Sequence, residues 1–74
     1  MLTIENIKEI RKKFNFYDED KSGYLRNNNL NNFLKSMKIY LTGSERTKIM
    51  ETIIIYNSGE VSFTEFIRFV LEDE

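Results

Sequence analysis

The 74-residue sequence contains no cysteine, histidine or proline, and it has only three glycines. Without cysteine no disulfide can form, and without thiolate or imidazole ligands a structural zinc site is excluded. The same absences exclude Ser–His, Cys–His and Cys-x-x-Cys chemistry. Eleven basic and twelve acidic residues give a net charge of −1. That balance argues against a nucleic-acid-binding protein, because such proteins need a basic face.

Long apolar segments are also missing. The longest apolar run, Ile53 to Tyr56, is far shorter than the ~20 residues of a membrane-spanning helix. The polar start of the chain does not resemble a signal peptide. We therefore expect a protein that does not span a membrane and that lies in the cytoplasm. Its length limits it to a single domain with a small core.

The apolar residues that are present recur at the spacing of amphipathic helices. Thr3 is suited to cap a first helix, and Thr42 with Glu45 three residues later forms a capping-box pattern before a third. Gly23 and Gly59 mark polar loops inside each half of the chain. Four stripes with spacings of three and four residues predict four helices. Their first apolar residues are Ile4, Leu30, Ile49 and Phe63.

The two halves of the chain repeat. Leu25 follows Gly23 by two residues, and Val61 follows Gly59 by two, at positions 36 residues apart. This symmetry predicts that Leu25 and Val61 face each other in a short antiparallel ladder that joins the two loops. We therefore predict an all-α fold, in which residues 1–74 form one lobe made of two helix–loop–helix units.

Residues 18–29 nearly fit the twelve-residue EF-hand calcium loop. Calcium is a hard ion that takes six to eight oxygen ligands, and such a loop supplies them at fixed positions. Gly23 at position six allows the sharp turn that this arrangement requires. The candidate metal ligands are Asp18, Asp20, Ser22, the backbone carbonyl of Tyr24, and Asn29.

Two positions weaken this candidate site. Position twelve, normally a bidentate glutamate, is the neutral Asn29, and position nine is Arg26, a cation that repels calcium. The formal ligand charge is only −2, from Asp18 and Asp20. The alternative interpretation is a solvated acidic turn between two helices. We expect calcium to bind this loop weakly or not at all.

The second loop, residues 54–65, is more degenerate. With Glu65 at position twelve, positions one and three are Ile54 and Tyr56, whose side chains offer no oxygen suited to calcium. Ser58 and Glu65 alone cannot form a ligand shell. We expect this loop to be free of metal.

With these motifs the chain resembles one lobe of the EF-hand superfamily of calmodulin and the myosin light chains. The resemblance is carried by Leu2-Thr3-x-Glu5 at the start and by Phe63-Thr64-Glu65-Phe66 at the exit of the second loop. Complete members have two such lobes, so the resemblance implies the amino-terminal lobe of a longer protein. The degenerate loops and the many asparagines, isoleucines and lysines are similar to the essential light chain of the gliding myosin of malaria-type parasites.

The resemblance implies a non-enzymatic module that binds and stiffens an amphipathic helix of a myosin heavy-chain neck, largely without calcium. It also implies a motor complex at an inner membrane. By the family pattern, six residues line the groove for this helix: Phe16, Leu34, Met37, Ile49, Phe69 and Val70. Five acidic residues are expected to steer a basic target: Glu9, Glu51, Glu72, Asp73 and Glu74. The alternative is that the six groove residues are plain core, above all Leu34 and Ile49.

Three other functions remain open. A calmodulin-like calcium sensor or buffer would have one weak site in the first loop, but sensors use the bidentate glutamate to open the lobe, and Asn29 cannot replace it. An enzyme would have only carboxylate or lysine chemistry at its disposal. Self-association, or exchange of helices between two copies, would hide an apolar groove that lacks its target.

Overall fold

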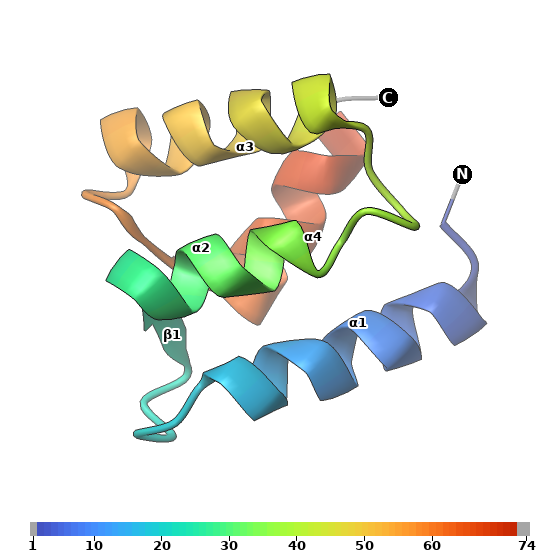
Figure 1. Ribbon diagram of the computed structural model, residues 1–74, viewed down its shortest axis with the longest axis horizontal. Helices are drawn as coiled ribbons and strands as arrows, with labels where there is room; N and C mark the ends of the chain where they lie inside the picture. Colours follow the sequence, from blue (N-terminus) through green and yellow to red (C-terminus); the bar gives the residue numbers. More distant parts are fainter. Residues whose placement is uncertain (1, 73–74) are drawn as a thin grey trace.

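The computed structural model describes residues 2–72, and these residues form four helices and a two-stranded ladder. The expected all-α fold of two helix–loop–helix units is confirmed. The ladder lies at one end of the molecule, and the α2–α3 connection lies at the other (Figure 1). No helix within residues 2–72 has the length and apolar character needed to cross a membrane. The elements in chain order are α1 (Ile4–Tyr17), β1 (Tyr24–Arg26), α2 (Asn27–Lys35), α3 (Gly43–Tyr56), β2 (Glu60–Ser62) and α4 (Phe63–Glu72).

Side-chain caps fix the starts of α1 and α3. The Thr3 hydroxyl accepts a hydrogen bond from the backbone N–H of Asn6, and the Asn6 side chain accepts one from the N–H of Thr3. Thr42 and Glu45 form the same reciprocal pair at the start of α3, with N···O distances of 2.8 and 3.1 Å. Both caps expected from the sequence are present, because a capping box depends only on residues three apart.

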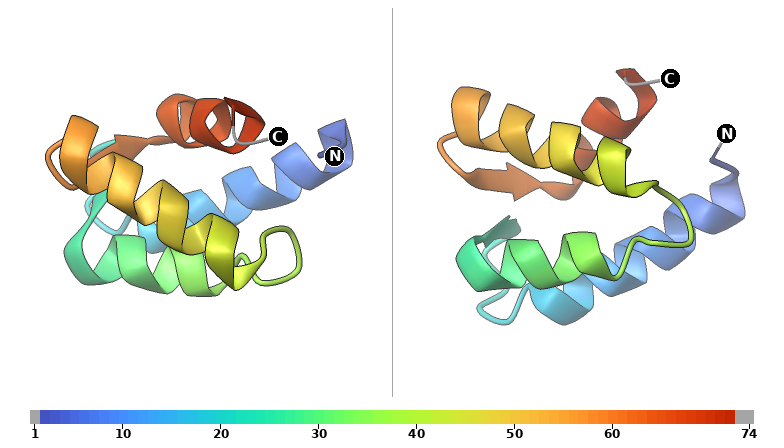
Figure 2. Two further views of the ribbon diagram at one scale, coloured as in Figure 1. Left: turned by 90° about the horizontal axis from the view of Figure 1, so that it is seen from above. Right: turned by 45° about the horizontal axis from the view of Figure 1, so that its top comes forward.

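The two strands pair antiparallel, with Leu25 directly opposite Val61. Both side chains are buried, with 1% and 0% of their surface exposed. The predicted ladder is therefore confirmed. The same register places Arg26 opposite Glu60, so the ladder brings the end of the first loop next to the second. In the right-hand view of Figure 2, α1 and α2 lie below, and α3 and α4 lie above.

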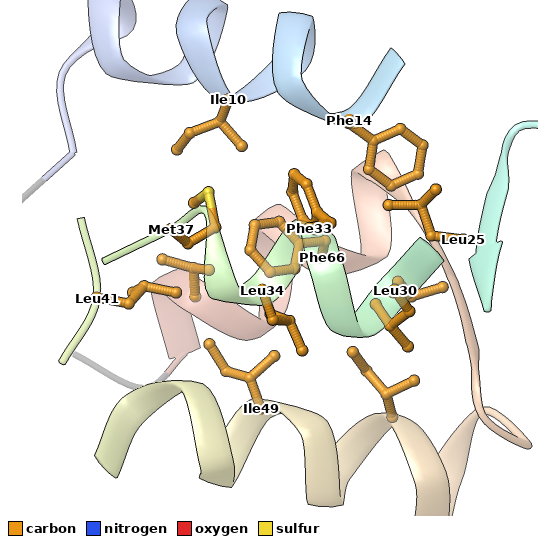
Figure 3. Close-up of a cluster of buried hydrophobic side chains, with 13 residues drawn as sticks. Ile10, Phe14, Leu25, Leu30, Phe33, Leu34, Met37, Leu41, Ile49 and Phe66 are labelled. Atoms are coloured by element: carbon orange, nitrogen blue, oxygen red, sulfur yellow. The ribbon is translucent and has the colours of Figure 1, made fainter. Parts of the chain in front are cut away.

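One cluster of buried side chains fills the space between the helices (Figure 3). Phe33 lies at its centre. The Phe33 ring packs edge-on against the rings of Phe14, Tyr17 and Phe66, with centroid distances of 5.5, 6.3 and 4.9 Å. Edge-to-face pairs of this kind add to the free energy gained by burial. The core therefore depends strongly on one residue of α2 that touches rings from both halves of the chain.

The second loop departs from the boundaries expected for it. α3 continues to Tyr56, so residues 54–56 are helical and are not the first positions of a loop. Only residues 57–59 separate α3 from β2, whereas residues 18–23 separate α1 from β1. No side chain at 54–56 breaks a helix, so the helix runs on until the chain turns at Ser58 and Gly59, where φ is 55° and 81°.

Candidate functional site

The first loop folds around the carboxylate of Asp18. This residue ends α1, and only 6% of its surface is exposed. One carboxylate oxygen accepts a hydrogen bond from the backbone N–H of Ser22 at 3.2 Å, and the other accepts from the N–H of Gly23 at 3.0 Å. Gly23 has a φ of 88°, which residues with a side chain rarely adopt. The turn is therefore organised by hydrogen bonds that the protein itself supplies.

The other candidate ligands are engaged in the same turn. The Asp20 carboxylate accepts from the N–H of Ser22 at 3.1 Å, and the Ser22 hydroxyl donates to the carbonyl of Tyr24 at 3.2 Å. Asn29 lies in the first turn of α2 and is half-buried. The structure thus gathers Asp18, Asp20, Ser22 and the Tyr24 carbonyl in one turn. It places a neutral amide where a calcium loop has its bidentate glutamate.

Arg26 spans the space between the two loops. Its Nη2 lies 3.4 Å from the Asp20 carboxylate, and its Nη1 lies 3.0 Å from the Glu60 carboxylate. Hydrogen bonds from Ser22, assisted by the charge of Arg26, hold the pKa of Asp20 below its ordinary value. Sequence reasoning missed Glu60. The ladder symmetry about Leu25 and Val61 was the signal that could have found it.

The acidic residue of the second loop supports a helix. The N–H of Glu65 donates to the Ser62 hydroxyl at 3.2 Å, and the N–H of Ser62 donates to the Glu65 carboxylate at 2.9 Å. This capping box starts α4, and the Ser-x-x-Glu spacing was the signal for it in the sequence. The backbone N–H of Ser62 is also the main cause that holds the pKa of Glu65 below its ordinary value.

The residues present do not fit the oxygen shell that calcium needs. Calcium takes six to eight oxygens, with a bidentate carboxylate among them in this type of loop. Within residues 2–72, no three His, Cys, Asp or Glu side chains are grouped so that they could hold a metal ion. The first loop keeps the acidic turn, and the second keeps the serine–glutamate pair at positions nine and twelve. Neither loop has both the acidic turn at its start and the glutamate at position twelve, so neither has a complete calcium site.

Asn29→Glu is expected to tighten calcium binding by at least about tenfold, because it restores one charge and two oxygens at position twelve. The unaltered loop should bind only in the ~10⁻⁴–10⁻³ M range, if at all. Calorimetric titration measures both values. Asn28→Glu is the matched control, since it adds the same charge one residue earlier on an exposed position. Equal affinities for the two variants would mean that calcium is not held in this geometry.

The Glu65 cap should make stability depend on pH. The pKa of Glu65 lies below the ordinary value of 4.5, so its charged form stabilises the folded state. That contribution is fully present above pH 4.5 and is lost as the pH falls through the lowered pKa. Glu65→Gln keeps a hydrogen-bonding cap without the titration. Urea unfolding should therefore show the protein with Glu65 to be slightly more stable than Glu65→Gln at neutral pH, by less than about 1 kcal/mol, because water screens the carboxylate. That difference should vanish in acid, and one that persists there would contradict the assignment.

The six residues predicted to bind a partner fall into two groups. Leu34, Met37, Ile49 and Val70 are buried in the core, with 0–5% of their surface exposed. Phe16 is 74% exposed and stacks edge-on against the neighbouring ring of Tyr17. Phe69 is half-buried against the core. In this conformation the first group stabilises the fold, and its role in binding a partner stays a prediction.

Two hollows open near these residues. One, of about 260 Å³, lies between the start of α1, the α2–α3 connection and Val70 of α4. The other, of about 170 Å³, lies between α3 and α4 and is lined by Ile49 and Phe69 together with Lys48, Thr52 and Glu72. Because Leu34, Met37, Ile49 and Val70 are buried, the lobe is closed over these predicted groove residues in this conformation. Of the acidic residues expected to steer a target, Asp73 and Glu74 lie outside the described residues.

Comparison with known proteins agrees with this architecture. The EF-hand domain pair family matches residues 7–71. Troponin C isoform 1 of Balanus nubilus is 30% identical over 74 residues, which cover 95% of this chain and 47% of that protein. Troponin C of Tyrophagus putrescentiae is 29% identical, over 99% of this chain and 50% of that protein. Calcium-binding protein 1 of Homo sapiens is 31% identical, over 86% of this chain and 17% of that protein. The chain spans about half the length of these troponin C relatives. Because the family match covers nearly the whole chain, this protein belongs to the EF-hand domain pair family.

Proposed function

We propose that this lobe is a constitutive helix-binding module, similar to a lobe of a myosin light chain, whose assembly does not depend on calcium. The observation that carries the proposal is that the neutral Asn29 stands where a calcium loop has its bidentate glutamate, while the Arg26 guanidinium lies against the Asp20 carboxylate. The Asp18 carboxylate is satisfied by backbone N–H groups, and Arg26 pairs with acidic residues of both loops. Proteins of this family are binding modules without catalytic activity, which favours this function over an enzyme.

The proposed target is an amphipathic helix with a basic side, such as the neck helix of a myosin heavy chain. Its apolar side would first meet Phe16 and Phe69, because these residues are accessible in the closed lobe. Met37, Ile49 and Val70 would follow only if α2 and α3 part from α1 and α4. Helix-in-groove binding of this kind depends on a few apolar anchors. A second lobe, cytoplasmic location and a motor complex at an inner membrane belong to the same proposal.

Two measurements in excess chelator test the proposal. Circular dichroism should show a folded helical protein, because a metal contributes little to this fold. A myosin-neck peptide titrated under the same conditions should bind, and calcium should change its affinity little. A chain that folds only with calcium, or a peptide that binds only with calcium, would contradict the proposal. Sedimentation measured alongside shows whether the lobe without peptide pairs with a second copy.

A calcium sensor is the second candidate function. Asp18, Asp20 and Ser22 do share one turn, as they would around a calcium ion. Similar proteins named troponin C and calcium-binding protein 1 point in the same direction. Against it stands Asn29, because a neutral amide cannot pull α2 outward as the bidentate glutamate of a sensor does. A large increase in exposed apolar surface on adding calcium would favour the sensor.

A further inference from the structure

We infer that the positive charge of Arg26 takes the place of a metal ion. Its guanidinium links the two loops by ion pairs, and it also keeps calcium out of the first loop. This inference rests on the proposed calcium independence and gives it a cause. Its starting point is the disagreement between the family's metal chemistry and the residues of this chain.

The position of Arg26 allows it to reach both loops. It is the last residue of β1 and lies directly opposite Glu60 of β2. From there one guanidinium contacts the Asp20 carboxylate at 3.4 Å and the Glu60 carboxylate at 3.0 Å. A guanidinium presents several N–H groups in a fixed fork, so one side chain can serve two carboxylates at once. The contacts join a residue of the first loop to a residue 40 positions later in the chain.

Arg26 performs this role at the expense of a helix cap. It occupies the N-cap position of α2 but makes no capping hydrogen bond with its side chain. The corresponding residue of the second loop, Ser62, does cap α4 together with Glu65. The two loops therefore use the side chain at position nine for different purposes. In the first half the side chain is directed across the ladder to Glu60, and in the second half it supports its own helix.

The same cation opposes calcium in two ways. It engages a carboxylate oxygen of Asp20, which is one of only two charged candidate ligands. It also places a positive charge at a position where a calcium loop often contributes a ligand through water. The side chains of Arg26, Asp20 and Glu60 are 51%, 60% and 40% exposed, so the contacts are partly screened by water and salt. The two ion pairs of Arg26 with Asp20 and Glu60, called the clamp below, should therefore be modest in strength and sensitive to ionic strength.

Arg26→Gln in the full 74-residue chain tests both parts of the inference. In chelator at low salt, amide hydrogen exchange of Leu25 and Val61 should become roughly threefold faster, because the cross-strand ion pair is lost. Calcium affinity measured by calorimetry should rise by about tenfold, because a positive charge next to the ion is removed. Lys8→Gln is the matched control. It makes the same charge change on an exposed residue of α1, about 15 Å along the helix from the loop. The exchange rates in the ladder and the calcium affinity should both stay unchanged in this variant.

Arg26→Lys separates the clamp from the charge. An ammonium keeps the positive charge but lacks the fork, so calcium affinity should stay low while exchange in the ladder becomes faster. Unchanged exchange in Arg26→Gln, or an equal change in Lys8→Gln, would overturn the clamp. Unchanged calcium affinity in Arg26→Gln would overturn the exclusion of calcium. A myosin-neck peptide that binds only with calcium would contradict the proposed function but would leave the exchange result in chelator intact, so the two failures can be told apart.

Discussion

Phe33→Ala is expected to leave the lobe largely unfolded at room temperature. The Phe33 side chain is fully buried and packs against the rings of Phe14, Tyr17 and Phe66, so its removal leaves a cavity that touches α1, α2 and α4. Truncation of a buried phenylalanine costs about 3–5 kcal/mol. A domain of this size without disulfide or structural metal rarely has more than about 3–5 kcal/mol of stability. Urea unfolding followed by circular dichroism measures the change.

Phe16→Ala is the matched control for this experiment. It removes the same atoms from a side chain that is 74% exposed, so the free energy of unfolding should change by less than about 1 kcal/mol. Phe33→Leu fills part of the cavity and should give a folded protein of intermediate stability. A Phe33→Ala protein as stable as the Phe16→Ala protein would show that the aromatic cluster does not hold the two halves together.

Phe69→Ala is expected to weaken capture of a myosin-neck peptide at least about tenfold while the lobe stays folded. The Phe69 side chain is half-buried and lines the hollow between α3 and α4 together with Ile49. Its ring is therefore partly available to a target. Aromatic anchors of this kind usually dominate the binding of a helix, with losses of about 2 kcal/mol or more on truncation. Calorimetric titration of the peptide in chelator measures the loss.

Leu71→Ala provides the control on the same helix. Leu71 is 47% exposed and does not line that hollow, so its truncation should leave peptide affinity nearly unchanged. If Phe69→Ala unfolds, Phe69 is a core residue like Val70, and the groove must be formed by other side chains. If it folds and binds normally, the light-chain mechanism loses its main anchor.

The sequence by itself determined the features that depend on residues close together in the chain. The caps at Thr3 and Thr42 follow from side chains that reach backbone groups only three residues away. The pairing of Leu25 with Val61 followed from the internal repeat, because two equivalent loops that pair antiparallel about their centres bring the two central residues opposite each other. The helical stripes fixed the fold class, since a small chain of four amphipathic helices must bury those stripes against one another.

Only the tertiary structure decided the contacts between residues far apart in the chain, the point where α3 ends, and the burial of individual side chains. The contact of Arg26 with Glu60 exists because the ladder places the two residues opposite each other. The late start of the second loop arose because α3 gained helical hydrogen bonds through Tyr56, where no metal ligand favoured a turn. The packing of the helices likewise decided that Met37 is enclosed, although its helical stripe left open whether it belongs to the core or to a binding groove. Burial is a property of the assembled helices, and a single helical stripe does not reveal how far its edges are covered.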